Sequence, residues 1–282
     1  MSQYVACYHQ WIAGQEAGLV ELKAASANAA AGRATDGELR AVVERCMRGY
    51  QDYASTRSAL SREDGTAFFA PRWCTALENS VLWIGGCRPS LTIRMLYNLS
   101  GEGLEAEVEE FLAGRGRGTF PTGTMGITFA QLMLINDLHA RTLRLEDALS
   151  ERLATLQEDV ADRPLLPIVR QRQRAAAAGL LLGAAGGPGG VDAEVDAALD
   201  SYKDALAQLL VEADELRMAT TRTLATEILT PRQGVDMLAA GKQLHLSLRD
   251  WSRRKEAAAR AQQQVMAPLA VATSTSTVGP NP

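Results

Sequence analysis

Aromatic side chains are scarce in this sequence, in which Phe, Trp and Tyr together make up 5% of 282 residues. Sandwiches and barrels of β-strands need many aromatic and β-branched residues, so this scarcity argues against both architectures. Alanine and leucine, by contrast, account for 82 of the 282 residues, and both favour helices. We therefore expect an all-α protein.

The sequence also lacks an excess of positive charge, because 33 acidic residues outweigh 29 basic ones and give a net charge of -4. Freestanding nucleic-acid-binding domains are usually basic, so this balance gives no support for direct binding of DNA or RNA. No window approaches 18 uninterrupted apolar residues, and Met1 to Leu22 lack the features of a signal peptide. We expect a protein of the nucleus, the cytoplasm or both.

Sequence motifs of metal binding and catalysis are missing as well. The four cysteines, Cys7, Cys46, Cys74 and Cys87, do not have the spacing of zinc ligands and are expected to be reduced thiols. There is no GxSxG, P-loop or HExxH motif, and the three histidines lie far apart in the sequence. We expect a protein that is not an enzyme and has no metal site.

Apolar residues recur three and four positions apart over most of the chain, as they do in amphipathic helices. The predicted helices cover residues 3–31, 36–60, 128–162, 191–229 and a last stretch that begins at Pro231. Asp36 and Thr128 are candidate N-caps, and Pro164 and Pro167 are expected to end the third of these helices. Long helices joined by Gly- and Pro-containing turns predict an antiparallel bundle.

Two stretches have the composition of flexible chain. Residues 183–190 are rich in Gly and Pro and are predicted to form an internal loop, and residues 267–282 are predicted to form a disordered tail. Residues 195–216 carry three apolar heptads, which fit either a seam inside the bundle or a zipper between two chains, and their shortness favours the seam. We expect one domain over residues 1–266.

The most unusual stretch of the sequence is residues 71–90, PRWCTALENSVLWIGGCRPS. Leu77, Val81 and Ile84 are spaced to share one helical face, and Gly85-Gly86 is expected to stop that helix. The large apolar residues of this stretch are expected to lie in the core, namely Trp73, Leu82, Trp83 and Ile84.

Arg88 and Pro89 follow the two glycines. Pro89 is well placed to begin the next helix, because its missing N–H costs nothing at the first helical position. Arg88 has two open roles: it binds carbonyls exposed where the preceding helix stops, or pairs with Glu78, or else it holds an anionic ligand. We favour the structural role, since a guanidinium satisfies several acceptors at once.

The predicted last helix carries two further candidates. His245 shares a face with Gly241 and either packs in the core or acts as a ligand, since a neutral imidazole is a good donor to haem iron. Trp251 precedes the basic run Arg253–Lys255, which forms either a solvated helix end or a site for calmodulin, nuclear import or phosphate groups. The sequence leaves these alternatives open.

The segment Leu77–Ser90 resembles the signature of the plant DOG domain, which delay-of-germination proteins share with the C-terminal half of TGA-type bZIP transcription factors. Residues 156–162, 209–217 and 229–247 resemble the delay-of-germination branch in particular, and the similarity extends over roughly residues 4–256. We therefore expect a single DOG domain. Its structural signature residues here are Trp73, Glu78, Trp83, Gly85, Gly86, Arg88 and Pro89.

The resemblance implies a non-enzymatic regulator of seed dormancy, germination and abscisic-acid signalling. In the delay-of-germination group, an N-terminal segment ending in Tyr-x-x-Trp docks onto type 2C protein phosphatases, and Tyr8 and Trp11 match this motif. The acidic residues that the group carries around the motif are replaced by Ala6 and Gln10, so we expect a weaker complex. The alternative is that both aromatic side chains simply pack onto the bundle.

Members of the group are also described as binding haem through two histidines four apart in the last helix. His245 matches the first of them, and Arg249 stands at the second position. A guanidinium has no free lone pair to offer to iron. We expect weak haem binding or none.

The resemblance to bZIP factors leaves a second function open. The match starts within the first ten residues, so we expect no basic region or zipper and DNA binding that is at most indirect. The alternative function is that of a nuclear, transcription-associated protein that binds bZIP factors.

Overall fold

The computed structural model describes residues 2–112, 125–177 and 189–273, and these residues form helices joined by short connections. No strand occurs within the described ranges, and the expected all-α fold is confirmed. The elements in chain order are α1 (Gln3–Ala30), α2 (Asp36–Ser61), α3 (Thr66–Phe69), α4 (Ala76–Ser80), α5 (Pro89–Leu112), α6 (Phe129–Val160), η1 (Ala161–Leu165), α7 (Leu166–Ala177), α8 (Gly189–Arg222), η3 (Thr223–Ile228) and α9 (Pro231–Thr273).

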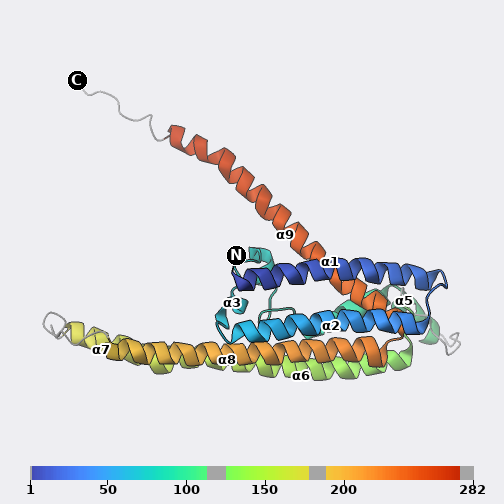
Figure 1. Ribbon diagram of the computed structural model, residues 1–282, viewed down its shortest axis with the longest axis horizontal. Coiled ribbons are helices and arrows are strands. Elements are labelled where there is room, and N and C mark those ends of the chain that lie inside the picture. Colours follow the sequence, from blue (N-terminus) through green and yellow to red (C-terminus); the bar gives the residue numbers. More distant parts are fainter. Residues whose placement is uncertain (1, 113–124, 178–188, 274–282) are drawn as a thin grey trace.

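The long helices form an antiparallel bundle. Figure 1 shows α1, α2, α8 and α6 lying side by side, each running opposite to the next, and each neighbouring pair is in contact. The last helix, α9, packs on α1 and α2, crosses α1 and then projects from the bundle (Figure 1). The predicted architecture is therefore confirmed, with α9 as a fifth long helix that covers one side.

Capping boxes fix the starts of α2, α4, α6 and α9, and the one at α4 joins Thr75 and Glu78. The Thr35 hydroxyl accepts from the Glu38 N–H at 3.3 Å, and the Glu38 carboxylate accepts from the Thr35 N–H at 2.8 Å. Thr35 is therefore the N-cap of α2, and the prediction of Asp36 is wrong by one residue because Thr-x-x-Glu satisfies two backbone donors reciprocally. Thr128 and Gln131 form the same arrangement at α6, so the predicted N-cap Thr128 is confirmed.

The main core lies where α1, α2, α5, α6, η3 and α9 meet, and a smaller apolar cluster lies between α6 and α8. In α8 the heptad residues Leu206, Leu209 and Ala213 are buried inside this chain, so the heptads form an intramolecular seam. The largest fully buried apolar side chains are Leu22, Val43, Met47, Ile93, Leu96, Ile135, Leu209, Leu210, Leu224, Val235 and Met237.

Pro164 does not end the helix that precedes it. The chain passes through the π-helical turn η1, where the Leu166 N–H donates to the Ala161 carbonyl, and continues as α7 through Pro167. A π-turn widens the hydrogen-bonding interval by one residue, which accommodates a proline that has no N–H. The predicted break at Pro164 and Pro167 is therefore wrong.

The predicted flexible stretches fall mostly outside the described residues. Of the loop predicted at 183–190, residues 183–188 lie outside them and the last two begin α8. Helix α9 continues to Thr273, past the predicted start of the tail at 267, and residues 274–282 lie outside the described part. The single domain over residues 1–266 stays a prediction.

Candidate functional site

The signature segment, residues 71–90, lies at one end of the bundle between α1 and α9. The Thr75 hydroxyl donates to the Ser252 hydroxyl at 2.9 Å, and the Ala76 N–H donates to the Glu256 carboxylate at 2.9 Å. Both acceptors belong to α9. The segment is thus fastened to the last helix by its own helix start.

The helix predicted from Leu77 to Ile84 is wrong. It ends at Ser80, and Leu77 and Val81 are 43% and 47% exposed. The buried residue of this short helix is Glu78, at 6% exposure. The ion pair between Glu78 and Arg249 of α9 decides which side of α4 faces inward, and the spacing of the apolar residues does not.

Two arginines, the buried Arg57 of α2 and the partly buried Arg217 of α8, hold the turn that follows. Arg57 donates to the Gly85 carbonyl at 2.8 Å. Asp214 of α8 pairs with both guanidinium groups, at 3.5 Å from Arg57 and 2.6 Å from Arg217. Arg217 of α8 donates at 2.5, 2.9 and 2.7 Å to the carbonyls of Trp83, Ile84 and Cys87. The turn has its backbone acceptors satisfied by side chains of two other helices.

This arrangement explains the two signature glycines. Gly85 has a φ of +65°, and a Cβ there would lie 2.7 Å from Leu210 and 2.8 Å from Arg57. A Cβ on Gly86 would lie 2.8 Å from the Arg217 guanidinium carbon. Only glycine lets both guanidinium groups approach the backbone this closely.

The large apolar residues of the segment are less buried than expected. Ile84 is 4% exposed and lies in the smaller apolar cluster, whereas Trp73, Leu82 and Trp83 are only partly buried. Trp83 donates its indole N–H to Ser150 at 2.9 Å. The prediction of four core residues is correct for Ile84 alone, because the other three line the edge of the segment.

Arg88 contacts different groups from the structural partners predicted for it, and the choice between a structural role and anion binding stays a prediction. Its Nη1 lies 3.7 Å from Glu146 of α6, and its guanidinium covers the Trp83 ring at 5.7 Å. Glu146 is completely buried and accepts from the backbone N–H and the hydroxyl of Ser90, at 2.6 and 2.9 Å. Pairing with Glu78 is wrong, and Arg217 performs the carbonyl binding expected of Arg88. Pro89 begins α5 as predicted.

Glu78, Arg249 and Tyr8 form a buried polar cluster that joins α4, α9 and α1. Arg249 Nη1 lies 3.1 Å from Glu78 Oε1 and donates to the Tyr8 hydroxyl at 2.8 Å, while that hydroxyl donates to Glu78 Oε1 at 3.1 Å. The Arg249 guanidinium also lies 4.8 Å from the centre of the Tyr8 ring. We call these three residues the latch.

The surroundings of Glu78 and Tyr8 shift the pKa values of both side chains. Burial alone raises the pKa of Glu78, but hydrogen bonds from Thr75 and the nearby Arg249 outweigh it and leave the pKa below its ordinary value. Burial raises the pKa of Tyr8 well above its ordinary value. The cluster therefore contains an ionised carboxylate, a guanidinium and a neutral phenol.

The sequence left two roles open for Tyr8 and Trp11, and the structure places them differently. Tyr8 is 6% exposed inside the bundle. Trp11 is partly exposed, stacks on Tyr53 at 4.2 Å and lies 5.4 Å from Tyr50. In this conformation Tyr8 packs as a core residue, and Trp11 stays partly exposed.

The residues at the expected haem site do not fit that group. Arg249 is 6% exposed and is engaged in the latch. His245 is partly buried, its ring lies 6.4 Å from that of Trp11, and burial lowers its pKa. Within the described ranges, no group of three His, Cys, Asp or Glu residues could hold a metal ion. A two-histidine iron site cannot form at these positions.

The basic run Arg253–Lys255 is open to solvent but lies in the middle of α9, which continues to Thr273, so the helix end predicted there is wrong. Trp251 is 60% exposed, and Arg253, Arg254 and Lys255 are exposed beside it. Arg254 pairs with Asp250 of the same helix. Arg253 and Lys255 form no ion pair with any of the described side chains. The calmodulin, nuclear-import and phosphate alternatives stay predictions.

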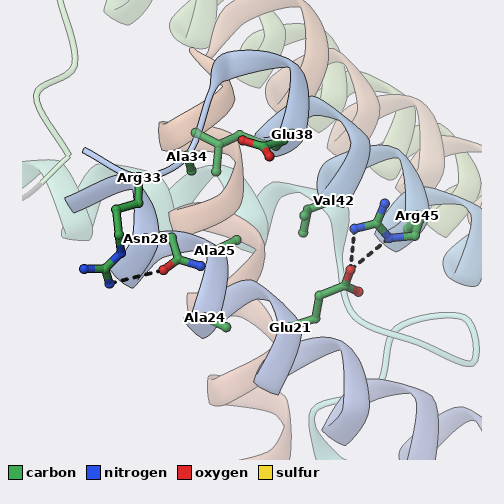
Figure 2. Close-up of a pocket in the computed structure, with 10 residues that line it drawn as sticks. Glu21, Ala24, Ala25, Asn28, Arg33, Ala34, Glu38, Val42 and Arg45 are labelled. Atoms are coloured by element: carbon green, nitrogen blue, oxygen red, sulfur yellow. Dashed lines mark hydrogen bonds and ion pairs between the residues drawn. The ribbon is translucent and has the colours of Figure 1, made fainter. Parts of the chain in front are cut away.

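A hollow of about 290 Å³ lies between the end of α1 and the start of α2 (Figure 2). Its charged groups have partners in the same region: Arg45 donates to Glu21 at 2.8 and 2.5 Å, Arg33 donates to the Asn28 side chain at 3.3 Å, and Glu38 accepts from Thr35. With these partners already engaged, the hollow offers little to a ligand.

Sequence reasoning missed the buried charged residues that organise the site. Arg57 lies on the apolar stripe of α2 and is 4% exposed, Lys242 is 4% exposed and donates to Gln15 at 3.0 Å, and Glu146 is fully buried in α6. A charged residue at an apolar position of a helix is the signal that could have found them. Their partners, which lie in distant segments, have no local signal.

None of the helices in the described part of the chain is both long and apolar enough to span a membrane.

Comparison with known proteins agrees with the signature. The DOG1 family model, described as seed dormancy control, matches residues 18–98. Protein DOG1-like 3 of Arabidopsis thaliana is 37% identical over 253 residues, which cover 89% of this chain and 84% of that protein. Protein RESPONSE TO ABA AND SALT 1 of Arabidopsis thaliana is 28% identical over 205 residues, or 73% of this chain and 74% of that protein. Transcription factor TGA2.1 of Oryza sativa subsp. japonica is 28% identical over 155 residues, or 55% of this chain and 38% of the factor.

Proposed function

The chain belongs to the DOG1 family of seed-dormancy-control proteins, and from this premise we propose that it is a non-enzymatic regulator of seed dormancy and abscisic-acid signalling. It acts as a helical adaptor that binds type 2C protein phosphatases. The similarity to a protein named for its response to abscisic acid and salt supports the signalling role. The docking role rests on the N-terminal turns of α1.

The observation that carries the docking role is the placement of Trp11. Its ring stacks on Tyr53, with 11° between the ring planes, and the residue is partly exposed. His9 and Gln10 beside it are exposed. Trp11 is therefore the residue of the aromatic pair that a partner reaches first, and a large aromatic side chain at such a position favours a hot spot.

The test is the binding of a purified abscisic-acid-pathway type 2C phosphatase, measured by calorimetry. Trp11→Ala is expected to weaken the complex at least tenfold, as the loss of a hot spot does. The matched control is Trp251→Ala, which removes an exposed tryptophan in the middle of α9 and is expected to change nothing. Circular dichroism of both variants shows whether the bundle is intact. If a folded Trp11→Ala protein binds like the unchanged chain, the docking role is refuted.

The match to TGA2.1 over 155 residues supports a second candidate function, that of a nuclear protein that binds bZIP factors. In this alternative the chain contacts DNA only through its partner. Precipitation of a tagged chain from seed nuclear and cytosolic extracts distinguishes the two functions. Recovery of bZIP factors without phosphatase from the nuclear extract favours the second.

A further inference from the structure

Tyr8 presents a conflict with docking, because the hydroxyl and ring that match the family motif are enclosed by the latch. The phenol is hydrogen-bonded to both Glu78 and Arg249, and the side chain is 6% exposed. A partner reaches Tyr8 only if the first turns of α1 leave the bundle. The question is therefore whether the helix is built to allow this movement.

The inward face of these turns has the pattern of a helix that binds in a groove. Tyr4, Tyr8 and Trp11 lie at positions i, i+4 and i+7, and Cys7 lies between them on the same side. In the structure this face packs on Trp73, Phe68 and Tyr53. An aromatic stripe of this spacing fits an apolar groove on a partner protein, so a groove of that kind replaces the aromatic packing that α1 gives up on opening.

A glycine ends this stretch of helix. A Cβ on Gly14 would meet nothing within 4 Å, so packing does not require its small size. Gly18, one turn further on, differs because a Cβ there would lie 3.1 Å from the Lys242 side chain. An exposed glycine within a helix costs stability relative to alanine. Its effect at this position is to make bending easier between residues 3–13 and the rest of α1.

The anchored part of α1 begins just after the glycine. Gln15 is 3% exposed and accepts from the Lys242 ammonium at 3.0 Å, and Leu19 and Leu22 follow in the core. Before the glycine, the long-range polar contacts of the buried side chains are those of the latch, while the exposed Gln3 and the partly buried Tyr4 donate to Glu63 and to the Leu60 carbonyl. The helix thus has a fixed part and a part whose buried polar contacts belong to a single cluster.

We propose that residues 3–13 form a hinged docking segment, held closed by the Glu78–Arg249 pair through Tyr8 and opening at Gly14 to insert Tyr4, Tyr8 and Trp11 into an apolar groove of the phosphatase. This inference rests on the proposed docking function. Only the open molecules bind the partner, so the apparent affinity is lower than that of the open form, in proportion to the small fraction of molecules that are open. Arg249 and Glu78 are positioning residues that set this fraction without touching the partner.

Opening can be measured without any partner through the thiol of Cys7, which is 8% exposed and adjacent to Tyr8. The full chain is labelled with N-ethylmaleimide, and the rate at each cysteine is read by peptide mass spectrometry. Cys87, which is exposed, reports the activity of the reagent. The double change Glu78→Gln/Arg249→Met removes both latch charges and keeps a glutamine that can complete the capping box with Thr75. It is expected to speed the labelling of Cys7 at least tenfold.

The hinge is tested by Gly14→Ala, expected to slow Cys7 labelling about fivefold, which corresponds to the helix preference of alanine over glycine. Its matched control is Gly49→Ala in α2, where an added Cβ also meets nothing within 4 Å. The control raises helix preference equally at a distance from the hinge. Equal slowing in both variants means that Cys7 is reached only by global unfolding, and the hinge is refuted.

The same variants are then titrated with the purified phosphatase. The latch variant is expected to bind at least tenfold tighter and Gly14→Ala about fivefold weaker. If Cys7 labelling shifts as expected but phosphatase binding does not, the hinge stands and the docking function fails. If labelling does not respond to the latch variant, the hinged segment is refuted whatever the phosphatase does.

Discussion

Arg249 and Glu78 are separated by 171 positions in the sequence and form an ion pair of 3.1 Å, in which both side chains are 7% exposed. The pair joins the last helix to the signature segment, and through Tyr8 it also holds the first helix. The residue at the position of a family haem ligand thus serves as a structural cation. Three segments that are distant in the sequence depend on it.

Breaking this pair on one side is expected to destabilise the protein strongly. Arg249→Met and Glu78→Gln each leave a buried partner without compensation, which typically costs about 3–5 kcal/mol for a charged partner. The double variant is expected to be more stable than either single variant, because it leaves no unpaired charge. Denaturant unfolding of the four proteins measures the coupling as a double-mutant cycle. Additive effects would show that the two side chains do not interact.

Stability is expected to fall in acid as Glu78 takes up a proton. The pKa of Glu78 in the folded protein lies below its ordinary value of 4.5, because the hydrogen bonds of Thr75 and the charge of Arg249 outweigh burial. The unfolded chain therefore binds the proton at higher pH than the folded one. The stabilisation is complete above pH 4.5 and is lost as the pH falls through the folded pKa. Melting curves between pH 3 and 7 should show a smaller loss for Glu78→Gln than for the unchanged chain.

Gly85→Ala is expected to destabilise the protein by about 2–5 kcal/mol. The substitution puts a Cβ 2.7 Å from Leu210 and 2.8 Å from Arg57 at a φ of +65°, so both overpacking and left-handed strain contribute. Gly49→Ala, at an open helical position, is the control and should be neutral or stabilising. Chemical denaturation of both variants checks the contrast. A Gly85→Ala protein as stable as the control would mean that the two arginines readily move aside.

Haem titration of the purified chain is expected to give no Soret band above that of free haem. The second imidazole is replaced by a guanidinium, which has no lone pair to donate and is held in the latch. His245→Ala should therefore leave the titration unchanged. A band that appears in the unchanged chain and disappears in this variant would contradict the expectation.

Phosphatase binding is expected to be tolerant of salt. Ala6 and Gln10 replace the acidic residues of other family members, and the two neutral side chains add no long-range attraction. Salt slows an association that is steered by charge, because it screens surface charges beyond about 10 Å at 0.1 M. Without such steering, raising the ionic strength from about 0.05 to 0.5 M should change the association rate less than threefold. Ala6→Glu/Gln10→Glu should restore a salt-dependent rate, as measured by stopped flow.

The sequence determined the elements whose signals are local. The all-α class follows from alanine and leucine content together with three- and four-residue apolar spacing, and the start of α9 at Pro231 follows from the rigid ring of proline. The start of α6 directly after its N-cap Thr128 follows from the capping box. The seam along α8 could also be anticipated, because its heptads are too short for a freestanding zipper. The family signature was equally visible, since it occupies one continuous stretch.

Only the tertiary structure decided how that stretch is used. Apolar spacing favoured a helix from Leu77 to Ile84, yet Glu78 faces inward because Arg249 compensates its charge. Arg217 and Arg57, from two other helices, bind the carbonyls assigned to Arg88. Buried ion pairs join residues more than a hundred positions apart, and their energy depends on desolvation and on distances that no local pattern encodes. Local propensity therefore fixes where the helices lie in the chain, and long-range charge pairing fixes which of their faces turn inward at the site.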